Sequence, residues 1–250
     1  MDILNIAAYR FVALDDPAQL RAAFKARAQA LGLKGTILVA PEGINLFLAG
    51  TEANIGAFLA TLRADTRFAA IGVKRSWSAS QPFKRLLVKI KREIVSMRRP
   101  EINPHAMPAP RLAPRELKRW LDEGRDIVLL DTRNQFEVDI GSFENTLSLK
   151  LKSFSDFPEA TPALAEASRD RVVVTFCTGG IRCEKAAPWL LSQGFREVYQ
   201  LDGGILNYFE QCGGAHFRGA CFVFDERVAV DTALRQTRAA PAGAELARPA

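Results

Sequence analysis

The stretch VVVTFCTGGIRCEKA (172–186) decides how the second half of the chain folds. Its apolar beginning, RVVVTFC (171–177), predicts a buried strand, and two glycines directly after it predict a turn. The residues EKAAPWLLSQGF (184–195) then have helical spacing, despite Pro188. Cys177 is thus expected at the carboxyl end of a strand, where open parallel sheets hold their ligands.

The surrounding sequence repeats this order of strand and helix. LAPRELKRWLDEG (112–124) predicts a short helix, and DIVLLDTR (126–133) a buried strand. EVYQLDGGI (197–205) predicts a further strand that ends in a glycine turn. Alternation of this kind is typical of an α/β domain with a parallel sheet.

The residues after Cys177 are those that would activate a thiol. Gly179 and Gly180 permit a positive φ, so the loop can turn its backbone N–H groups toward the sulfur. A helix that begins near Cys183, together with Arg182, would lower the thiol pKa. A buried structural cysteine is the alternative, but it explains neither the glycine pair nor the arginine. We therefore take Cys177 as the catalytic nucleophile, inside an anion-binding loop formed by Thr178, Gly179, Gly180, Ile181, Arg182 and Cys183.

Loop length separates two kinds of chemistry. Four residues lie between Cys177 and Arg182, whereas cysteine phosphatases have five. The shorter ring suits a single sulfur atom, such as a persulfide, better than a phosphate. Cys183 could resolve a persulfide on Cys177 by forming a disulfide, or it could simply be a small residue at the start of the helix.

The first half predicts a β-α-β-β-α-β sandwich over residues 1–101. Strand-like runs at 3–14, 35–51 and 71–77 alternate with helical spacing at 15–33 and 52–65, where Asp16 and Pro17 are typical of a helix start. The middle run divides at PEG into a hairpin. The fold class expected for the whole chain is a ferredoxin-like (acylphosphatase-like) α+β sandwich followed by a parallel-sheet α/β domain.

Charge is distributed unevenly along the chain. Residues 1–112 hold 17 Lys+Arg against 8 Asp+Glu, whereas residues 113–216 hold 12 against 16. Nine basic residues and one acid lie between Lys74 and Arg99, and VKIK alternates in a way that predicts a Lys-rich strand face. A polyanion-binding surface and a solvated edge strand explain this equally well. The candidates for RNA contact are Lys89, Lys91, Arg92, Arg98 and Arg99.

The remaining sequence features bear on domain boundaries, localisation and metal binding. Residues 102–112 predict a Pro-rich linker, and 217–250 a C-terminal segment whose Ala/Pro-rich end is expected to be disordered. The sequence has no long apolar run and no basic leader, so we expect a cytoplasmic protein that does not bind membranes. The cysteines have no C-x-x-C spacing, and His105 and His216 lie in isolation, so no metal site is expected. We expect Cys212 and Cys221 to be structural.

Several motifs resemble known families. DTR (131–133), Glu137, the cysteine loop and LLSQGFREVYQLDGGI (190–205) resemble a rhodanese domain, which would occupy residues 113–216. PEGIN (41–45), the basic stretch that ends in SMRRPEINP (96–104), CTGGIRCEKA (177–186) and CFVFDER (221–227) are together similar to the tRNA uridine hydroxylase family. Longer members of that family continue into a cysteine-rich segment, whereas VAVDTALRQTRAAPAG follows here, so we expect that segment to be accessory.

The resemblance implies a reaction and its partners. The family hydroxylates C5 of the wobble uridine in tRNA, which gives 5-hydroxyuridine, and its active-site cysteine corresponds to Cys177. Molecular oxygen and an unknown reductant are implied; no cofactor motif is recognisable, and the sequence lacks flavin and nicotinamide fingerprints. The partner would be a tRNA anticodon stem-loop rather than DNA. A thiosulfate or persulfide sulfurtransferase is the alternative, and a non-catalytic RNA-binding protein with a relic rhodanese domain is a third reading, which the intact loop disfavours.

Overall fold

The computed structural model describes residues 2–237, except for the side chains of residues 165–167. The Ala/Pro-rich end, which we expect to be disordered, lies outside the described residues from position 238 onward. The chain divides into two compact units, Met1–Met107 and Pro108–Ala250. Within residues 2–237, no helix has the length and apolar character that crossing a bilayer requires.

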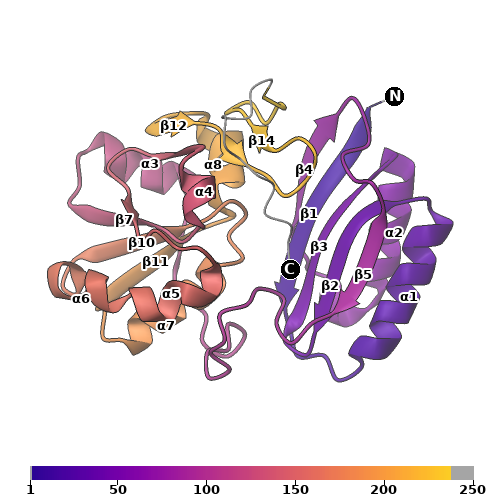
Figure 1. Ribbon diagram of the computed structural model, residues 1–250, viewed down its shortest axis with the longest axis horizontal. Helices are drawn as coiled ribbons and strands as arrows, with labels where there is room; N and C mark the ends of the chain where they lie inside the picture. The colour runs from indigo at the N-terminus through magenta and orange to yellow at the C-terminus, as the bar shows by residue number, and fades with distance from the viewer. Residues whose placement is uncertain (1, 238–250) are drawn as a thin grey trace. The chain divides into compact units, whose positions relative to one another are not determined.

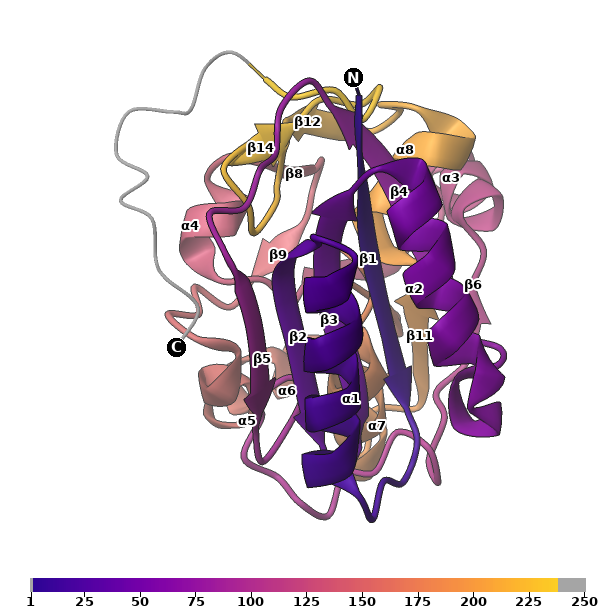
Figure 2. The same ribbon diagram turned by 90° about the vertical axis from the view of Figure 1, so that its right-hand side faces the viewer.

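The first unit is a five-stranded sheet with two helices on one of its faces (Figures 1 and 2). The sheet order is β4-β1-β3-β2-β5, in which β5 runs parallel to β2 and the other neighbours are antiparallel. Its elements are β1 (Ile3–Phe11), α1 (Pro17–Ala30), β2 (Lys34–Ala40), β3 (Gly43–Gly50), α2 (Glu52–Ala64), a 3-10 turn at Thr66–Phe68, β4 (Val73–Ser78) and β5 (Leu86–Ile90). The expected ferredoxin-like sandwich is confirmed, with β5 added at its edge.

Apolar side chains at alternate strand positions point into the core of the first unit. Leu4, Ile6 and Ala8 of β1 join the apolar cluster that includes buried residues of α1 and α2. Asp16 precedes α1 as expected, but its carboxylate does not cap the helix. Both of its oxygens accept from the Arg67 guanidinium instead, at 2.6 and 3.1 Å, in a bidentate pair.

The Lys-rich strand face expected from VKIK is only partly present. Strand β5 ends at Ile90, so Lys91 lies beyond it. Val88 is buried beside β2, whereas Lys89 and Ile90 are both exposed, Ile90 by 49%. The alternation breaks because this edge strand leaves the core at its last residues.

The second unit is built on a parallel sheet. The sheet order is β6-β11-β10-β7-β9, and every neighbouring pair is parallel. Its elements are β6 (Arg111–Leu112), α3 (Pro114–Asp122), β7 (Ile127–Asp131), α4 (Gln135–Val138), β8 (Gly141–Phe143), β9 (Leu147–Ser148), a 3-10 turn at Phe154–Asp156, α5 (Phe157–Ala160), α6 (Pro162–Ser168), β10 (Val172–Phe176), α7 (Cys183–Ser192), β11 (Glu197–Leu201), α8 (Gly204–Cys212), β12 (Phe217–Gly219), β13 (Cys221–Phe222) and β14 (Ala229–Val230). The expected parallel-sheet α/β domain is confirmed.

An aromatic cluster joins the end of this unit to its sheet. The Phe143 ring packs edge-on against the rings of Phe176, Tyr208 and Phe217, with centroids 4.7–5.2 Å apart. Strand β12 also pairs with β8, and β13 pairs with β14. Residues 217–230 are therefore folded as part of the second unit.

Candidate active site

The parallel sheet brings three chain segments to one edge. Cys177 follows the last residue of β10, and Thr132 follows the last residue of β7. Gly203 and Gly204 follow β11 and start α8. Because the carboxyl ends of parallel strands share an edge, residues far apart in the sequence meet around the cysteine loop.

The loop places a backbone donor on the Cys177 sulfur. The Gly180 N–H donates to Sγ at 3.1 Å, and Gly180 has a φ of 95°, a value that glycine adopts without strain. Burial raises the pKa of the Cys177 thiol, but a hydrogen bond from Cys183, the Arg182 charge and the N–H groups of Arg182 and Gly180 outweigh it and lower the pKa to about 6. Cys177 is thus suited to be a thiolate nucleophile near neutral pH.

Cys183 lies at the other end of the loop. It is fully buried at the first position of α7, and its N–H donates to the carbonyl of Gly180 at 3.1 Å. Its sulfur is also 3.7 Å from the hydroxyl of Thr132, which in turn donates to the Phe176 carbonyl at 2.9 Å. Burial and the neighbouring Cys177 raise the pKa of Cys183 well above its usual value. The site therefore combines one thiolate and one thiol.

Arg182 acts on the sulfur through its backbone and its charge. Its guanidinium forms a two-pronged pair with the carboxylate of Glu137, at 2.8 and 3.1 Å, and lies 5.6 Å from the Phe224 ring centroid. Glu137 is fully buried, and its carboxylate also accepts from the Asn134 N–H at the start of α4. The pair fixes the far end of the cysteine loop to α4.

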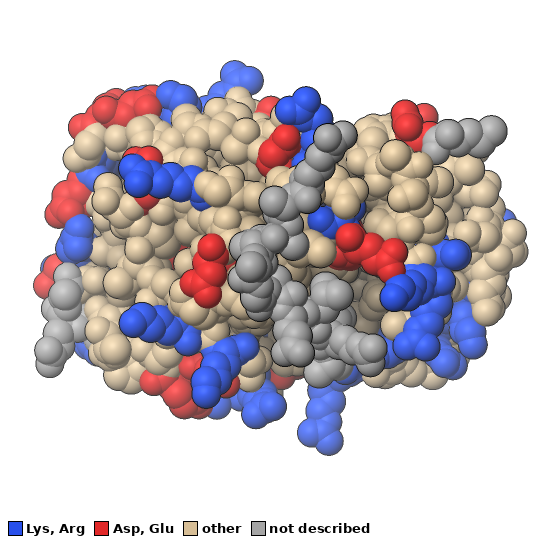
Figure 3. Space-filling model, turned by 45° about the horizontal axis from the view of Figure 1, so that its top comes forward, with Lys and Arg blue, Asp and Glu red and all other residues tan. Residues whose placement is uncertain are grey.

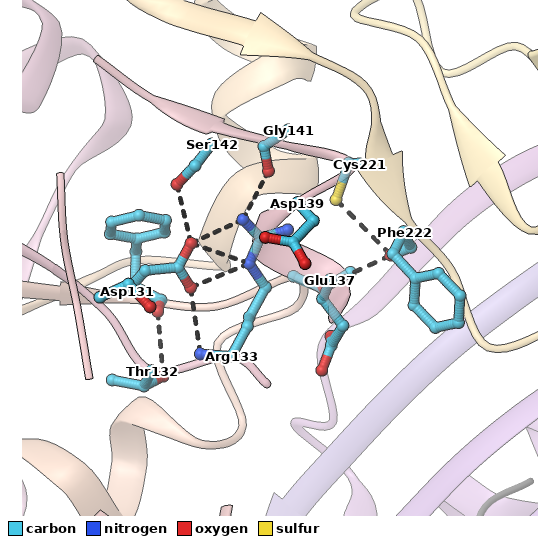
Figure 4. Close-up of polar contacts among 12 residues, drawn as sticks. Asp131, Thr132, Arg133, Glu137, Asp139, Gly141, Ser142, Cys221 and Phe222 are labelled. Carbon is cyan, nitrogen blue, oxygen red and sulfur yellow. Dashed lines mark hydrogen bonds and ion pairs between the residues drawn. The ribbon is translucent and has the colours of Figure 1, made fainter. Parts of the chain in front are cut away.

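A second buried ion pair supports the neighbouring strand (Figure 4). The Arg133 guanidinium donates to both carboxylate oxygens of Asp131 and to the Gly141 carbonyl, the last at 2.7 Å. The Ser142 hydroxyl donates to the same Asp131 carboxylate at 2.8 Å. Both charged side chains are fully enclosed by protein, so this pair holds β7 against β8 and presents no group to a ligand.

The start of α8 closes the loop from the opposite side. The Ile205 N–H donates to the Cys177 carbonyl at 2.9 Å, and the Leu206 N–H to the Thr178 carbonyl at 3.1 Å. Gly204 permits this approach, because a Cβ there would lie 2.4 Å from the Cys177 oxygen and 2.7 Å from the Gly180 nitrogen. Our sequence interpretation did not assign Gly204 to the site, although the LDGGI run held the signal.

Residues that follow the rhodanese-like motifs also reach the loop. The Thr178 hydroxyl donates to the Phe222 carbonyl at 3.4 Å, and the Phe222 ring packs edge-on against Phe136. Cys221 is buried beside them, and this burial raises the pKa of its thiol to about 12. Thr178, Gly179 and Ile181 remain partly exposed and form the accessible rim of the loop.

The first unit orders its basic segment with the PEGIN residues. The Glu42 carboxylate accepts from the Ile94 N–H at 2.7 Å, and the Asn45 amide donates to the Ile94 carbonyl at 3.3 Å. The Glu93 carboxylate accepts from the N–H groups of Met97 and Arg98, at 2.8 and 3.0 Å. These bonds give the chain between Lys89 and Arg99 a fixed course.

The basic candidates differ in exposure. Lys89, Arg92 and Arg98 are exposed, whereas Lys91 and Arg99 are half-buried. Figure 3 shows lysine and arginine side chains interspersed with acidic ones over much of the face in view. Contact of these residues with RNA stays a prediction.

Both histidines lie away from the cysteine loop in the sequence and have ordinary surroundings. His105 is exposed, and the ring of His216 is 2.7 Å from the Asp122 carboxylate. Within the described part of the chain, no cluster of three or more His, Cys, Asp or Glu side chains is arranged to hold a metal ion.

Comparison with known proteins identifies the family of this chain, which the geometry of the site does not. The family model for the UPF0176 acylphosphatase-like domain matches residues 3–94, and that for the rhodanese-like domain matches residues 113–211. A tRNA uridine(34) hydroxylase of Variovorax paradoxus is 56% identical over 251 residues, covering 98% of this chain and 95% of that protein. Proteins of the same name from Cupriavidus taiwanensis and Bordetella avium are each 55% identical, covering 94% of this chain and 85% and 99% of theirs. The chain belongs to the tRNA uridine(34) hydroxylase family.

Proposed function

We propose that this chain hydroxylates uridine 34 of tRNA at C5 and that Cys177 is the nucleophile. The reaction class comes from relatives that are about 55% identical over nearly the whole chain. The observation that ties it to one site is the Cys177 thiolate, held by backbone N–H groups in a six-residue loop. A sulfurtransferase would use the same loop, but it would not need the basic first unit.

The loop chemistry supports nucleophilic addition to a pyrimidine. The Cys177 thiolate would add to C6 of the uracil ring and make C5 electron-rich, so that C5 can react with molecular oxygen. The sulfur itself is almost fully buried, and Thr178, Gly179 and Ile181 form the exposed rim. A uridine would therefore have to leave the stacked anticodon and enter at this rim.

The basic segment of the first unit is the proposed contact with the anticodon stem-loop. Lys89, Arg92 and Arg98 are exposed on a chain segment that Glu42, Glu93 and Asn45 hold in place. A fixed row of positive charges loses little conformational entropy when it binds phosphates. Because tRNA is the proposed substrate, a cytoplasmic location is part of this proposal.

Mass spectrometry of tRNA nucleosides tests the function. We would compare cells that express the wild-type chain, no chain, Cys177→Ser or Cys212→Ser. We expect 5-hydroxyuridine and its derivatives to disappear in the deletion and in Cys177→Ser. They should remain in Cys212→Ser, because Cys212 is the last residue of α8 and its charged neighbours are Arg115, Lys118 and Asp122. Normal 5-hydroxyuridine in Cys177→Ser would contradict the role of Cys177. An unchanged profile in the deletion, in a strain without another route to this nucleoside, would contradict the activity.

A further inference from the structure

The hydroxylation needs two electrons that the substrate does not provide. Molecular oxygen accepts four electrons when one of its atoms enters uridine and the other becomes water. Oxidation of the uridine C5–H to C5–OH supplies two of these. A donor of the other two must therefore act at the site, and this inference rests on the function proposed above.

A second thiol lies at the far end of the loop that holds the reactive one, and both residues are bonded to Gly180. Cys183 is fully buried, and its N–H donates to the Gly180 carbonyl at 3.1 Å, while the Gly180 N–H donates to the Cys177 sulfur at 3.1 Å. The Cys183 sulfur is 3.7 Å from the Thr132 hydroxyl, and the neighbouring Cys177 raises its pKa. Both cysteines are free, and the turn at Gly179 and Gly180 connects them. A purely structural role requires only a small residue at this position, whereas the two thiols here shift each other's pKa in opposite directions.

We propose that Cys183 is a second catalytic residue: Cys177 and Cys183 together supply the two electrons of the hydroxylation and end as a disulfide. The overall reaction is uridine + O2 + two thiols → 5-hydroxyuridine + disulfide + H2O. Atoms balance, since one oxygen enters the base and the other leaves in water with both thiol protons. Electrons balance, since uridine and the thiol pair each lose two.

The steps follow from the positions of the two sulfurs. The Cys177 thiolate adds to C6, and C5 attacks oxygen to give a C5 hydroperoxide. Loss of the C5 proton and cleavage of the C6–S bond restore the ring and release the Cys177 thiolate. This thiolate attacks the terminal hydroperoxide oxygen, which breaks the O–O bond and leaves 5-hydroxyuridine and a Cys177 sulfenic acid. Cys183 then attacks the Cys177 sulfur, forms the S–S bond and expels water.

The difference between the two thiols suits this order. Cys177 is the thiolate that starts the reaction, and Cys183 stays protonated beside it, because burial and the neighbouring Cys177 raise its pKa. Cys183 therefore does not compete as the first nucleophile. It can lose its proton when the Cys177 sulfur is oxidised, because the negative charge next to it is then gone. A small thiol would reduce the disulfide between turnovers.

A single-turnover experiment tests the proposal without any variant. The full chain, fully reduced and freed of reductant, is mixed with excess unmodified tRNA in aerated buffer. We expect one 5-hydroxyuridine per chain at most, two of the four thiols lost per product, and a peptide that links Cys177 to Cys183 in the mass spectrum. Product formed while all four thiols stay free would overturn the proposal.

Variants separate this inference from the proposed function. Cys183→Ser keeps a hydroxyl that can donate to Cys177 but cannot form the disulfide. In a single turnover without added thiol we expect Cys183→Ser to lose one thiol per product instead of two, and to leave Cys177 as a sulfenic acid that dimedone traps. Wild type, in which Cys177 ends in the disulfide, should give no dimedone adduct. Cys212→Ser should match wild type.

Circular dichroism shows whether Cys183→Ser is folded. If the variant is misfolded, the thiol count of the wild-type chain is the deciding result. If wild type yields no 5-hydroxyuridine even with dithiothreitol, the proposed function fails; if it yields product without the disulfide, only the role of Cys183 fails.

Discussion

At the scale of single residues, the charge on Cys177 is the first property to measure. Its pKa is lowered to about 6, whereas burial raises the pKa of Cys183, Cys212 and Cys221. We expect thiolate absorbance at 240 nm to rise in one step with a midpoint near pH 6, and this step to be absent in Cys177→Ser. A titration with its first step above pH 8 would contradict the proposed activation.

The same group makes stability depend on pH. The Cys177 pKa is lower in the folded chain than the value of 9.0 for a free thiol, so the folded chain binds fewer protons between these values. The free energy of unfolding should therefore gain a contribution as the pH rises from about 6 toward 9, and lose it as the pH falls through 6. Urea unfolding at pH 5.5 and 8 measures this. The gain should be smaller in Cys177→Ser, and an equal gain in both would contradict it.

Gly204 is a second decisive residue, because its missing side chain makes room for the cysteine loop. Gly204→Ala should cost about 1–2 kcal/mol for a positive φ and about 1–3 kcal/mol more for the overlap with the Cys177 and Thr178 carbonyls. Gly124→Ala is the matched control, since φ is 63° there and 67° at Gly204, but open space surrounds its Cβ. We expect only Gly204→Ala to lose hydroxylation in vitro. Equal effects on unfolding and activity would show that backbone strain alone matters.

At the scale of elements, the Arg182–Glu137 pair connects the cysteine loop to α4. Glu137→Gln would leave the buried arginine without a compensating charge, so we expect about 3–5 kcal/mol of destabilisation. Asp126→Asn removes the carboxylate from an exposed pair with Arg171 and should cost less than about 1 kcal/mol. Thermal unfolding of both variants makes the comparison. A small effect of Glu137→Gln would show that water reaches Arg182.

The sequence predicts the individual helices and strands well, but it does not predict the contacts between distant elements. The strand before Cys177, the helix after it and the alternation in the first half are local patterns, and the structure confirms the fold that they predict. Glu42 and Asn45 belong to a recognisable motif, but their bonds to Ile94 join positions about fifty residues apart. No local pattern encodes such a distance. The packing of Phe222 beside Thr178 is equally non-local.

At the scale of the whole molecule, the prediction concerns the uneven charge. Replacing Lys89, Arg92 and Arg98 with glutamate should weaken tRNA binding at least tenfold and reduce the slope of log Kd against log salt by about 1 for each phosphate that the protein no longer binds. Lys25, Lys34 and Lys152 are exposed as well, and their replacement changes the net charge equally. Fluorescence titrations at several salt concentrations should show that this control set retains the wild-type slope. Equally weakened binding in both sets would indicate a diffuse field rather than a binding surface.

The bonds from α8 to the cysteine loop have a consequence for redesign. One added residue would give the loop the length found in cysteine phosphatases. Here the carbonyls of Cys177 and Thr178 are fixed by Ile205 and Leu206, and Arg182 is fixed by Glu137. Any insertion must therefore bulge outward between Gly179 and Ile181, and the ring of amides around the sulfur cannot widen to the size of a phosphate. Changing the chemistry of this scaffold would require a new start to the helix that follows β11, as well as a longer loop.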